Sequence, residues 1–291
     1  MKLLFRTIEE VRKFITVDIS SNFKTIEPYI YQAKKYIVDV LGEELYSKLI
    51  DYLHNTDSTK ENKYEDLLDK VRYPLSNYAY YLAISKLNVK VGENGFTVAV
   101  TQNTEPASEW RVREFRESVL TSADDGLEEL IIFLEKHSKD YPLWKTSESY
   151  SFNRKFFINN ANDILDTVNI AVTRREFLKN KHIIFDVETR QLTPILGVPF
   201  FYELKQSFKN NSLETNFAFI VDNYIKPLLC YSVVNKEEYK AQIEFYTNSM
   251  INYLNANPQK YVLFQQSSYF VPAGEAITGY ENTEDSAFFF F

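Results

Sequence analysis

The chain has 291 residues, of which 45% are hydrophobic and 25% charged, a composition that indicates a globular protein and excludes a disordered one. This length suits two domains of about 100–150 residues, and a count of only 7 glycines favours helices over glycine-consuming barrels and hairpin arrays. The formal net charge of −7 argues against a protein that wraps DNA by neutralising its phosphates.

The N-terminal stretch MKLLFRTIEEV has an apolar run of three residues, too short for the core of a signal peptide. Apolar runs further along, such as LIIFL, are well below the roughly 18 residues that cross a bilayer. The single cysteine, Cys230, excludes an internal disulfide and fits a reducing compartment. We therefore expect a soluble protein that contacts no membrane.

The first clear helical pattern covers residues 25–42, TIEPYIYQAKKYIVDVLG, where apolar side chains recur every three or four positions. Its first residue, a threonine, is the expected cap, and Pro28 suits a first helical turn. Gly42 supplies a left-handed stop. Further helices are predicted over 43–53 and 64–87.

A β-hairpin is predicted after these helices, within an arm at about residues 88–107. Alternating valines flank the turn Gly92-Glu93-Asn94-Gly95, a pattern typical of a hairpin. An isolated hairpin is marginal in water, so we expect Phe96, Val98 and Val100 to lie in an interface. Both the arm's own domain and the sheet edge of a neighbouring subunit are candidates for the other side.

The second half of the chain repeats the first in the same order. Matching stretches lie 151 to 155 positions apart before the arm and 120 positions apart after it, so the first copy carries the arm as an insertion. A long helix over 109–137 follows the arm, and its counterpart covers 236–257. The matches are Thr16–Ile19 with Thr167–Ile170, VLGEELYSKL with ILGVPFFYEL, Pro74-Leu75 with Pro227-Leu228, and YPLW with YVLF at 141–144 and 261–264.

This repeat predicts a mainly α fold of two tandem helical-bundle domains related by duplication. The predicted domains are residues 1–150, with the arm inserted, and residues 151–270, followed by an extended C-terminal tail at 271–291. The tail carries Phe288, Phe289, Phe290 and Phe291 in succession. Four exposed rings would exceed the largest apolar patch of a typical monomer, about 300–600 Å². We expect them to be covered, either by the chain's own domains or, in the interpretation we favour, by another subunit.

Residues with catalytic chemistry are sparse. The histidines, His54, His137 and His182, have no second ligand at metal spacing, and the chain has none of the usual phosphate-loop or nucleophile motifs. Arg111, Arg113 and Arg116 alternate with glutamates, which favours pairing within the helix over a nucleic-acid site. We therefore expect no enzyme, no cofactor and no metal.

Paired carboxylates keep one alternative open, a metal-dependent helical enzyme. Pairs such as Glu128-Glu129 and Glu237-Glu238 would support it if they converged with a histidine in one cleft. Adjacent helical residues point in different directions, however, and acidic residues near helix starts have a simpler role beside the helix dipole.

One resemblance adds to this interpretation. The stretches IEPYIYQAKKYIVDVLGEELYSKLIDYL and YPLSNYAYYLAISKL resemble the small helical head–tail connector proteins of tailed bacteriophages, most of all a duplicated form in phages and prophages of Bacteroidota. The shared pattern is A-x-x-Y-I…LG-x-x-LY-x-x-L followed by a tyrosine-rich helix. It covers most of the first copy, and the second more weakly, and it transfers no functional residue.

The resemblance implies a virion structural protein, assembled in the host cytoplasm. Its subunits would form a homo-oligomeric ring, often twelvefold, beneath the portal protein, with DNA passing non-specifically through the lumen. A tail or further connector protein would be the other neighbour. A different tail-completion or capsid-associated structural protein is the alternative that uses the same residues.

Overall fold

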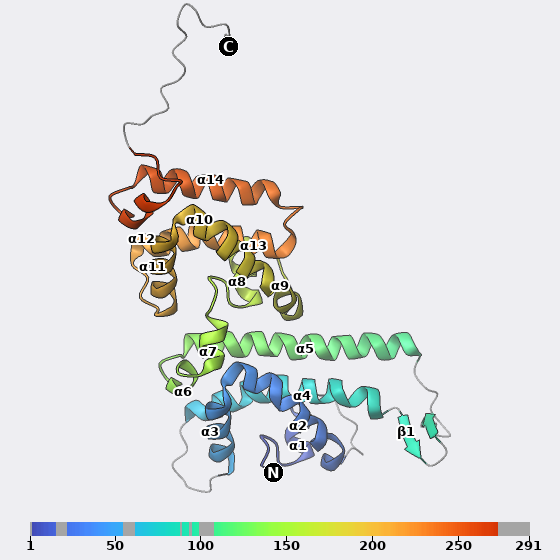
Figure 1. The fold of residues 1–291 in the computed structure, drawn as a ribbon. Coiled ribbons are helices and arrows are strands. Elements are labelled where there is room, and N and C mark those ends of the chain that lie inside the picture. The colour runs from blue at the N-terminus through green and yellow to red at the C-terminus, as the bar shows by residue number, and fades with distance from the viewer. Residues whose placement is uncertain are drawn as a thin grey trace, which may run out of the picture. The chain divides into compact units, whose positions relative to one another are not determined.

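The computed structural model describes residues 2–15, 22–54, 62–87, 89–92, 95–98 and 108–272. It is mainly helical, as predicted (Figure 1). The chain divides into two compact units. Unit 1 comprises the chain up to Lys155 together with Asn159–Leu165 and Ile170–Lys179, and unit 2 comprises Phe156–Ile158, Asp166–Asn169 and the chain from Asn180 onward. The segments between residues 156 and 179 thus alternate between the units, whereas the predicted boundary is a single point near residue 150.

Unit 1 contains the first helices and two short strands. The elements up to residue 153 are α1 (Ile8–Arg12), α2 (Phe23–Leu41), α3 (Glu43–His54), α4 (Asn62–Leu87), β1 (Val89–Gly92), β2 (Gly95–Val98), α5 (Glu109–Lys136), α6 (Pro142–Lys145) and α7 (Glu148–Asn153).

The elements after residue 153 include two π-helical turns, η1 and η2, each continuous with the α-helices around it. In chain order these elements are α8 (Ala161–Val168), α9 (Arg174–Val187), η1 (Glu188–Leu192, π), α10 (Thr193–Leu196), α11 (Val198–Lys209), α12 (Thr215–Ile220), η2 (Val221–Ile225, π), α13 (Lys226–Asn235), α14 (Lys240–Ala256) and the 3₁₀-helix η3 (Val262–Gln266).

The start of α2 differs from the prediction. Asn22, and not Thr25, is the cap, since its side chain accepts a hydrogen bond from the Lys24 amide at 3.1 Å. The helix therefore begins earlier, and Pro28 lies beyond its first turn. Its buried stripe of Ile26, Ile30, Ala33, Ile37, Val40 and Leu41 follows the predicted period.

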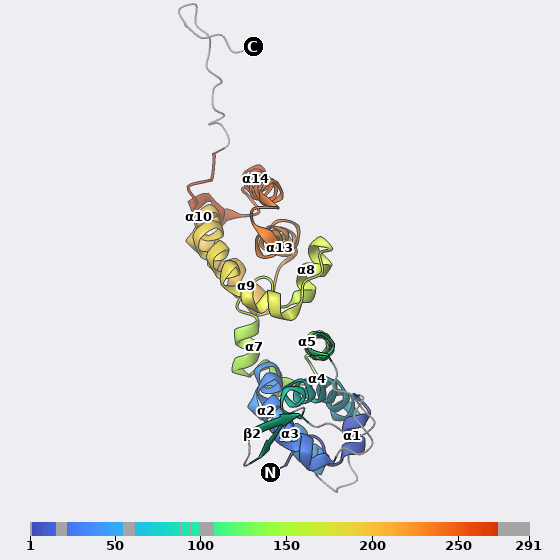
Figure 2. The same cartoon turned by 90° about the vertical axis from the view of Figure 1, so that its right-hand side faces the viewer.

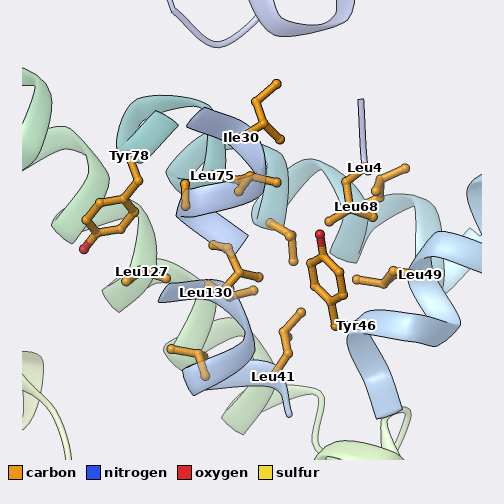
Figure 3. Packing of buried hydrophobic residues seen from close by; sticks show 14 of the residues in the cluster. Leu4, Ile30, Leu41, Tyr46, Leu49, Leu68, Leu75, Tyr78, Leu127 and Leu130 are labelled. Carbon is orange, nitrogen blue, oxygen red and sulfur yellow. The ribbon is translucent and has the colours of Figure 1, made fainter. Parts of the chain in front are cut away.

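The core of unit 1 lies where α2, α3, α4 and α5 meet, and α4 and α5 run side by side (Figure 1). Tyr46 and Leu49 of α3 point toward Leu68 of α4, while Leu127 and Leu130 of α5 close another side (Figure 3). All five are nearly or completely buried, and each such side chain contributes roughly 1.5–3 kcal/mol to folding. Gly126 lies within α5 and does not interrupt it.

In unit 2, α13 and α14 pack against each other and are seen nearly end-on in Figure 2. The continuous helix Thr215–Asn235, formed by α12, η2 and α13, is the one helix of the described chain long and apolar enough to span a membrane by length and composition. Asp222 and Lys226 interrupt its apolar residues, so the expectation about uninterrupted apolar runs is not contradicted. Half of its apolar window is buried within the protein.

The corners before α3 and α11 share an unusual backbone. Gly42 has φ 78° and ψ 155°, and Gly197 has φ 78° and ψ 143°, a region that essentially only glycine adopts. A serine covers each corner: a Cβ on Gly42 would lie 2.7 Å from the Ser147 Cβ, and a Cβ on Gly197 would lie 3.3 Å from the Ser267 Cα. The two corners therefore have the same backbone conformation and the same type of covering residue.

The segment that covers each corner is held in a matching way. Tyr141 donates its hydroxyl to the Lys63 carbonyl (2.6 Å) near the start of α4, and Tyr261 donates its hydroxyl to the Asn216 carbonyl (3.1 Å) near the start of α12. The T-shaped ring pairs in these segments are Trp144–Tyr150 and Phe264–Phe270. The sequence comparison aligned Tyr150 with Tyr269, whereas the ring contacts align Tyr150 with Phe270.

The two strands pair antiparallel, with Val89 opposite Val98 and Gly92 opposite Gly95. Residues 99–107, including Val100, lie outside the described residues, as do Phe288, Phe289, Phe290 and Phe291. The predicted arm and tail, as contacts between subunits, therefore stay predictions.

We expect Gly42→Ala and Gly197→Ala each to destabilise the protein by about 2 kcal/mol, because a methyl group adds strain at this backbone conformation. The loss at Gly42 should be the larger, since the added Cβ would collide with Ser147. Thermal unfolding followed by circular dichroism measures the effect, and Ser118→Ala, at an exposed position on α5, serves as the neutral control. Unchanged melting temperatures in both glycine variants would contradict the role assigned to the corners.

Candidate interaction surface

The carboxylates of α5 are held by basic residues at the start of α9, within unit 1. Arg174 Nη1 lies 2.6 Å from Glu128 Oε1, and the amide of Ala161 donates to the other Glu128 oxygen at 3.2 Å. Arg175 bridges two carboxylates, with Nε 2.7 Å from Asp124 Oδ2 and Nη1 3.1 Å from Glu117 Oε2. Asp124 and Glu128 therefore have partners within the protein.

Burial shapes the electrostatics of this contact. It raises the pKa of Glu128, and Arg174 and the amide hydrogen bonds oppose that rise. Burial also raises the pKa of Tyr78, and the hydrogen bond that its hydroxyl donates to Asp124 raises this pKa further. The two arginines thus offset the cost of enclosing two carboxylates in a contact where Asp124 is 4% exposed.

The remaining acidic pairs and histidines do not gather into a site. Glu129 pairs with Lys70 at 3.1 Å, and Glu238 accepts a hydrogen bond from Asn235 at 3.1 Å. The ring of His54 lies 3.1 Å from the Leu3 carbonyl oxygen, part of the main chain. No group of three or more His, Cys, Asp or Glu side chains that could hold a metal occurs in the described part of the chain.

The basic residues at the start of α5 do not all pair as predicted. Arg116 donates to the Tyr81 hydroxyl of α4 at 3.1 Å and stacks on the same ring, while Glu117 accepts from Arg175. The predicted pairing within α5 was therefore wrong for Arg116 and Glu117, because helices that pack alongside supply nearer partners.

A buried ion pair in unit 2 has no counterpart in the sequence predictions. Lys205 Nζ lies 2.6 Å from Glu188 Oε2 and 3.9 Å from the centre of the Phe157 ring. The amide of Phe157 donates to the other Glu188 oxygen at 2.9 Å. In the sequence, Lys205 and Glu188 are a lysine and a glutamate among apolar helical residues, which is the one hint of a buried ion pair. Tertiary packing decides that these two residues are partners.

Aromatic side chains form two groups of ring contacts along η2, α13 and α14, which together we call the seam. The rings of Tyr231 and Tyr239 lie 5.0 Å apart, those of Tyr231 and Tyr246 6.0 Å, and those of Tyr224 and Tyr253 5.7 Å. These five tyrosines are half-buried, so each has a ring edge and a hydroxyl that a further partner could contact.

Next to this seam, one stripe of α14 is exposed and almost without charge. The stripe, which we call the α14 face, consists of Ala241, Glu244, Phe245, Asn248 and Asn252. Phe245 is 64% exposed, and Glu244 is the one charged residue of the five. Depletion of charge together with exposed aromatic rings is the composition of protein–protein interface cores. The α14 face and the seam therefore form the candidate site.

We expect Arg174→Met to destabilise the protein by about 3 kcal/mol, because the Glu128 carboxylate would stay buried without its partner. The deficit should shrink as the pH falls toward the ordinary carboxyl range, since the pKa of Glu128 is raised in the folded state and protonation removes the buried charge. Urea unfolding at two pH values measures both effects. Arg113→Met, at an exposed position on the same surface, is the control and should change stability by less than about 0.5 kcal/mol.

No curated protein and no solved structure matches this chain. A family of unknown function, DUF6712, matches residues 37–154, 192–236 and 234–273. These ranges cover more than half of the chain and include α3 to α5 and α11 to α14. The protein is therefore a member of the DUF6712 family.

Proposed function

We propose that this protein is a structural subunit of a tailed-bacteriophage virion, a head–tail connector that forms a homo-oligomeric ring beneath the portal protein. The observation that carries the proposal is the α14 face, an exposed and nearly uncharged stripe beside a seam of half-buried tyrosines. Such a surface favours permanent contact with protein. The resemblance of the α2, α3 and α4 sequences to connector proteins names the kind of assembly.

We further propose that the chain arose by duplication of one helical domain. The support comes from pairs of contacts at the sequence separations of the repeat. The Val40 carbonyl accepts from the Trp144 indole (3.0 Å), and the Ile195 carbonyl, 155 positions later, accepts from the Ser267 hydroxyl (2.6 Å). The two acceptors correspond in the repeat, whereas the two donors are different residues of the covering segments. The paired corners at Gly42 and Gly197, also 155 positions apart, have the same backbone conformation.

The long last helices correspond as well. The Phe133 and Tyr141 rings lie 6.0 Å apart, and the Tyr253 and Tyr261 rings, each 120 positions later, lie 6.1 Å apart. Buried Leu134 of α5 likewise corresponds to buried Leu254 of α14. We infer that α14 is the counterpart of α5, and α13 with η2 the counterpart of α4.

In this proposal the subunit is scaffolding and catalyses no reaction. The arm at about residues 88–107 and the rings of Phe288–Phe291 supply additional contacts between neighbours, with the portal on one side and a tail or connector protein on the other. The negative net charge of the chain suits a lumen through which DNA slides without binding. The site of action is the virion, with assembly in the host cytoplasm.

We expect the purified protein to form rings, alone or on addition of a portal protein, because in this proposal a neighbouring subunit covers the exposed α14 face. Solution mass by light scattering and negative-stain imaging of the full chain test this directly. A monomer that stays monomeric at high concentration and does not bind a portal would overturn the proposal.

Deletion of residues 284–291 should reduce assembly strongly while leaving the helical content unchanged, since each Phe ring that is buried contributes at most roughly 1.5–3 kcal/mol to the contact. Circular dichroism and solution mass, measured on the same samples, separate folding from assembly. Replacing Glu284 and Asp285 by Asn and keeping the four phenylalanines is the matched control and should preserve assembly. Equal assembly of the deletion variant and the full chain would argue against the tail as an anchor.

A further inference from the structure

We infer that the α14 face binds the first turn of α2 from a second copy of this chain, so that subunits join head to tail. The inference rests on the proposed function, and on the proposed duplication within it. It names the two surfaces that meet in the assembly.

The first step is a contact already present within unit 1. The first turn of α9 lies against α5, with Arg174 on Glu128 and Arg175 on both Asp124 and Glu117. By the repeat, α9 is the counterpart of α2, because each begins just after a capping residue, Thr173 or Asn22, 151 positions apart. In the proposed duplication, α9 of the second copy thus begins on α5, the long last helix of the first copy.

The second step is the corresponding surface on α14. At a separation of 120 positions, Asp124 corresponds to Glu244, and Glu128 corresponds to Asn248. Asp124 is 4% exposed and Glu128 is half-buried, whereas their counterparts Glu244 and Asn248 are both exposed. No residue that the structure describes therefore covers, on α14, the positions that correspond to those covered by α9 on α5.

The third step is the chemistry of the proposed partner. Arg175 corresponds to Lys24, the second residue of α2, which is exposed. Both carboxylates that hold Arg175 have acidic counterparts, because Glu117 corresponds to Glu237 in the turn before α14 and Asp124 corresponds to Glu244. The contact within the chain and the contact we propose between chains therefore both place one basic residue opposite two acidic residues.

The second ion pair changes on both sides together. Arg174 corresponds to Phe23, and its partner Glu128 corresponds to Asn248. A charge left on one side alone would be costly in a buried contact, but here both members are uncharged. Phe23 is half-buried, and Phe245 lies next to Asn248, so an apolar contact replaces the ion pair.

The geometric consequence is a heterologous interface. One surface of each copy, the start of α2, meets a different surface of the next copy, the α14 face. Contacts of this kind generate closed rings or open filaments, in contrast to the two-fold dimers made by a self-complementary surface. The inference thus supplies the type of contact that the proposed ring requires.

Charge reversal tests the pairing. Lys24→Glu alone and Glu244→Lys alone should each weaken assembly at least about tenfold, because like charges then face each other across the contact. An equal mixture of the two variants should assemble like the wild type, since every interface between alternating subunits again joins opposite charges. Both positions are exposed, so circular dichroism should show unchanged helical content. Lys48→Glu, exposed on α3, is the control and should not affect assembly.

The outcomes separate the inference from the function it rests on. A wild type that never assembles overturns the proposed function and this inference with it. A wild type that assembles while both single reversals also assemble overturns the inference alone. Single variants that fail to assemble and are not rescued by mixing would also overturn the inference. Such a result would mean that Lys24 and Glu244 act within one chain, or that residues 273–291 of the same chain bind the α14 face.

Phe245→Ala provides a measurement that does not depend on charge. The ring is 64% exposed, so its loss should leave thermal stability nearly unchanged and lower the association constant at least about tenfold, as expected for an aromatic anchor in an interface. Val262→Ala, an exposed apolar residue outside the α14 face, is the matched control. Equal association constants for these two variants and the wild type would contradict the assignment.

Discussion

The backbone turn at Gly42, together with the turn of the same conformation at Gly197, is the constraint on which the architecture of this protein depends. A glycine in an extended conformation with positive φ allows two helices to meet without a loop, so that α3 begins one residue after α2 ends. That sharp corner directs Tyr46 and Leu49 of α3 inward against α4 (Figure 3). Its close backbone also allows a serine to pack directly on the glycine.

The aromatic residues that follow act together with these corners. Tyr141 and Trp144 are nearly completely buried, and each uses its polar atom to satisfy a main-chain carbonyl, at Lys63 and at Val40. Tyr261 satisfies the carbonyl of Asn216 in the same way. Aromatic side chains with one polar atom can therefore close a helical bundle while pairing carbonyls at the ends of its helices. The high tyrosine content thus has a structural role before any role in assembly.

The buried charged residues of α5, unlike the aromatic residues, pair with side chains and not with main-chain carbonyls. Asp124 and Glu128 are enclosed by arginines from a segment about 50 residues further along the chain, so these acidic residues of α5 have partners within the protein. Such a pair is costly to break and weakly stabilising when intact. In the proposed duplication, Glu244 and Asn248 of α14 take the places of Asp124 and Glu128, and both are exposed.

The sequence by itself determined the elements whose signals are local. The apolar period of α2 and the glycine stop at Gly42 both follow from residues a few positions apart. The cap at Asn22 was missed because Thr25 is an equally good local signal. Only the tertiary structure decided the partners of Arg116, Glu128, Arg175 and Lys205, and which face of α14 stays exposed. Those outcomes depend on distances between side chains far apart in the chain, and no local pattern encodes them.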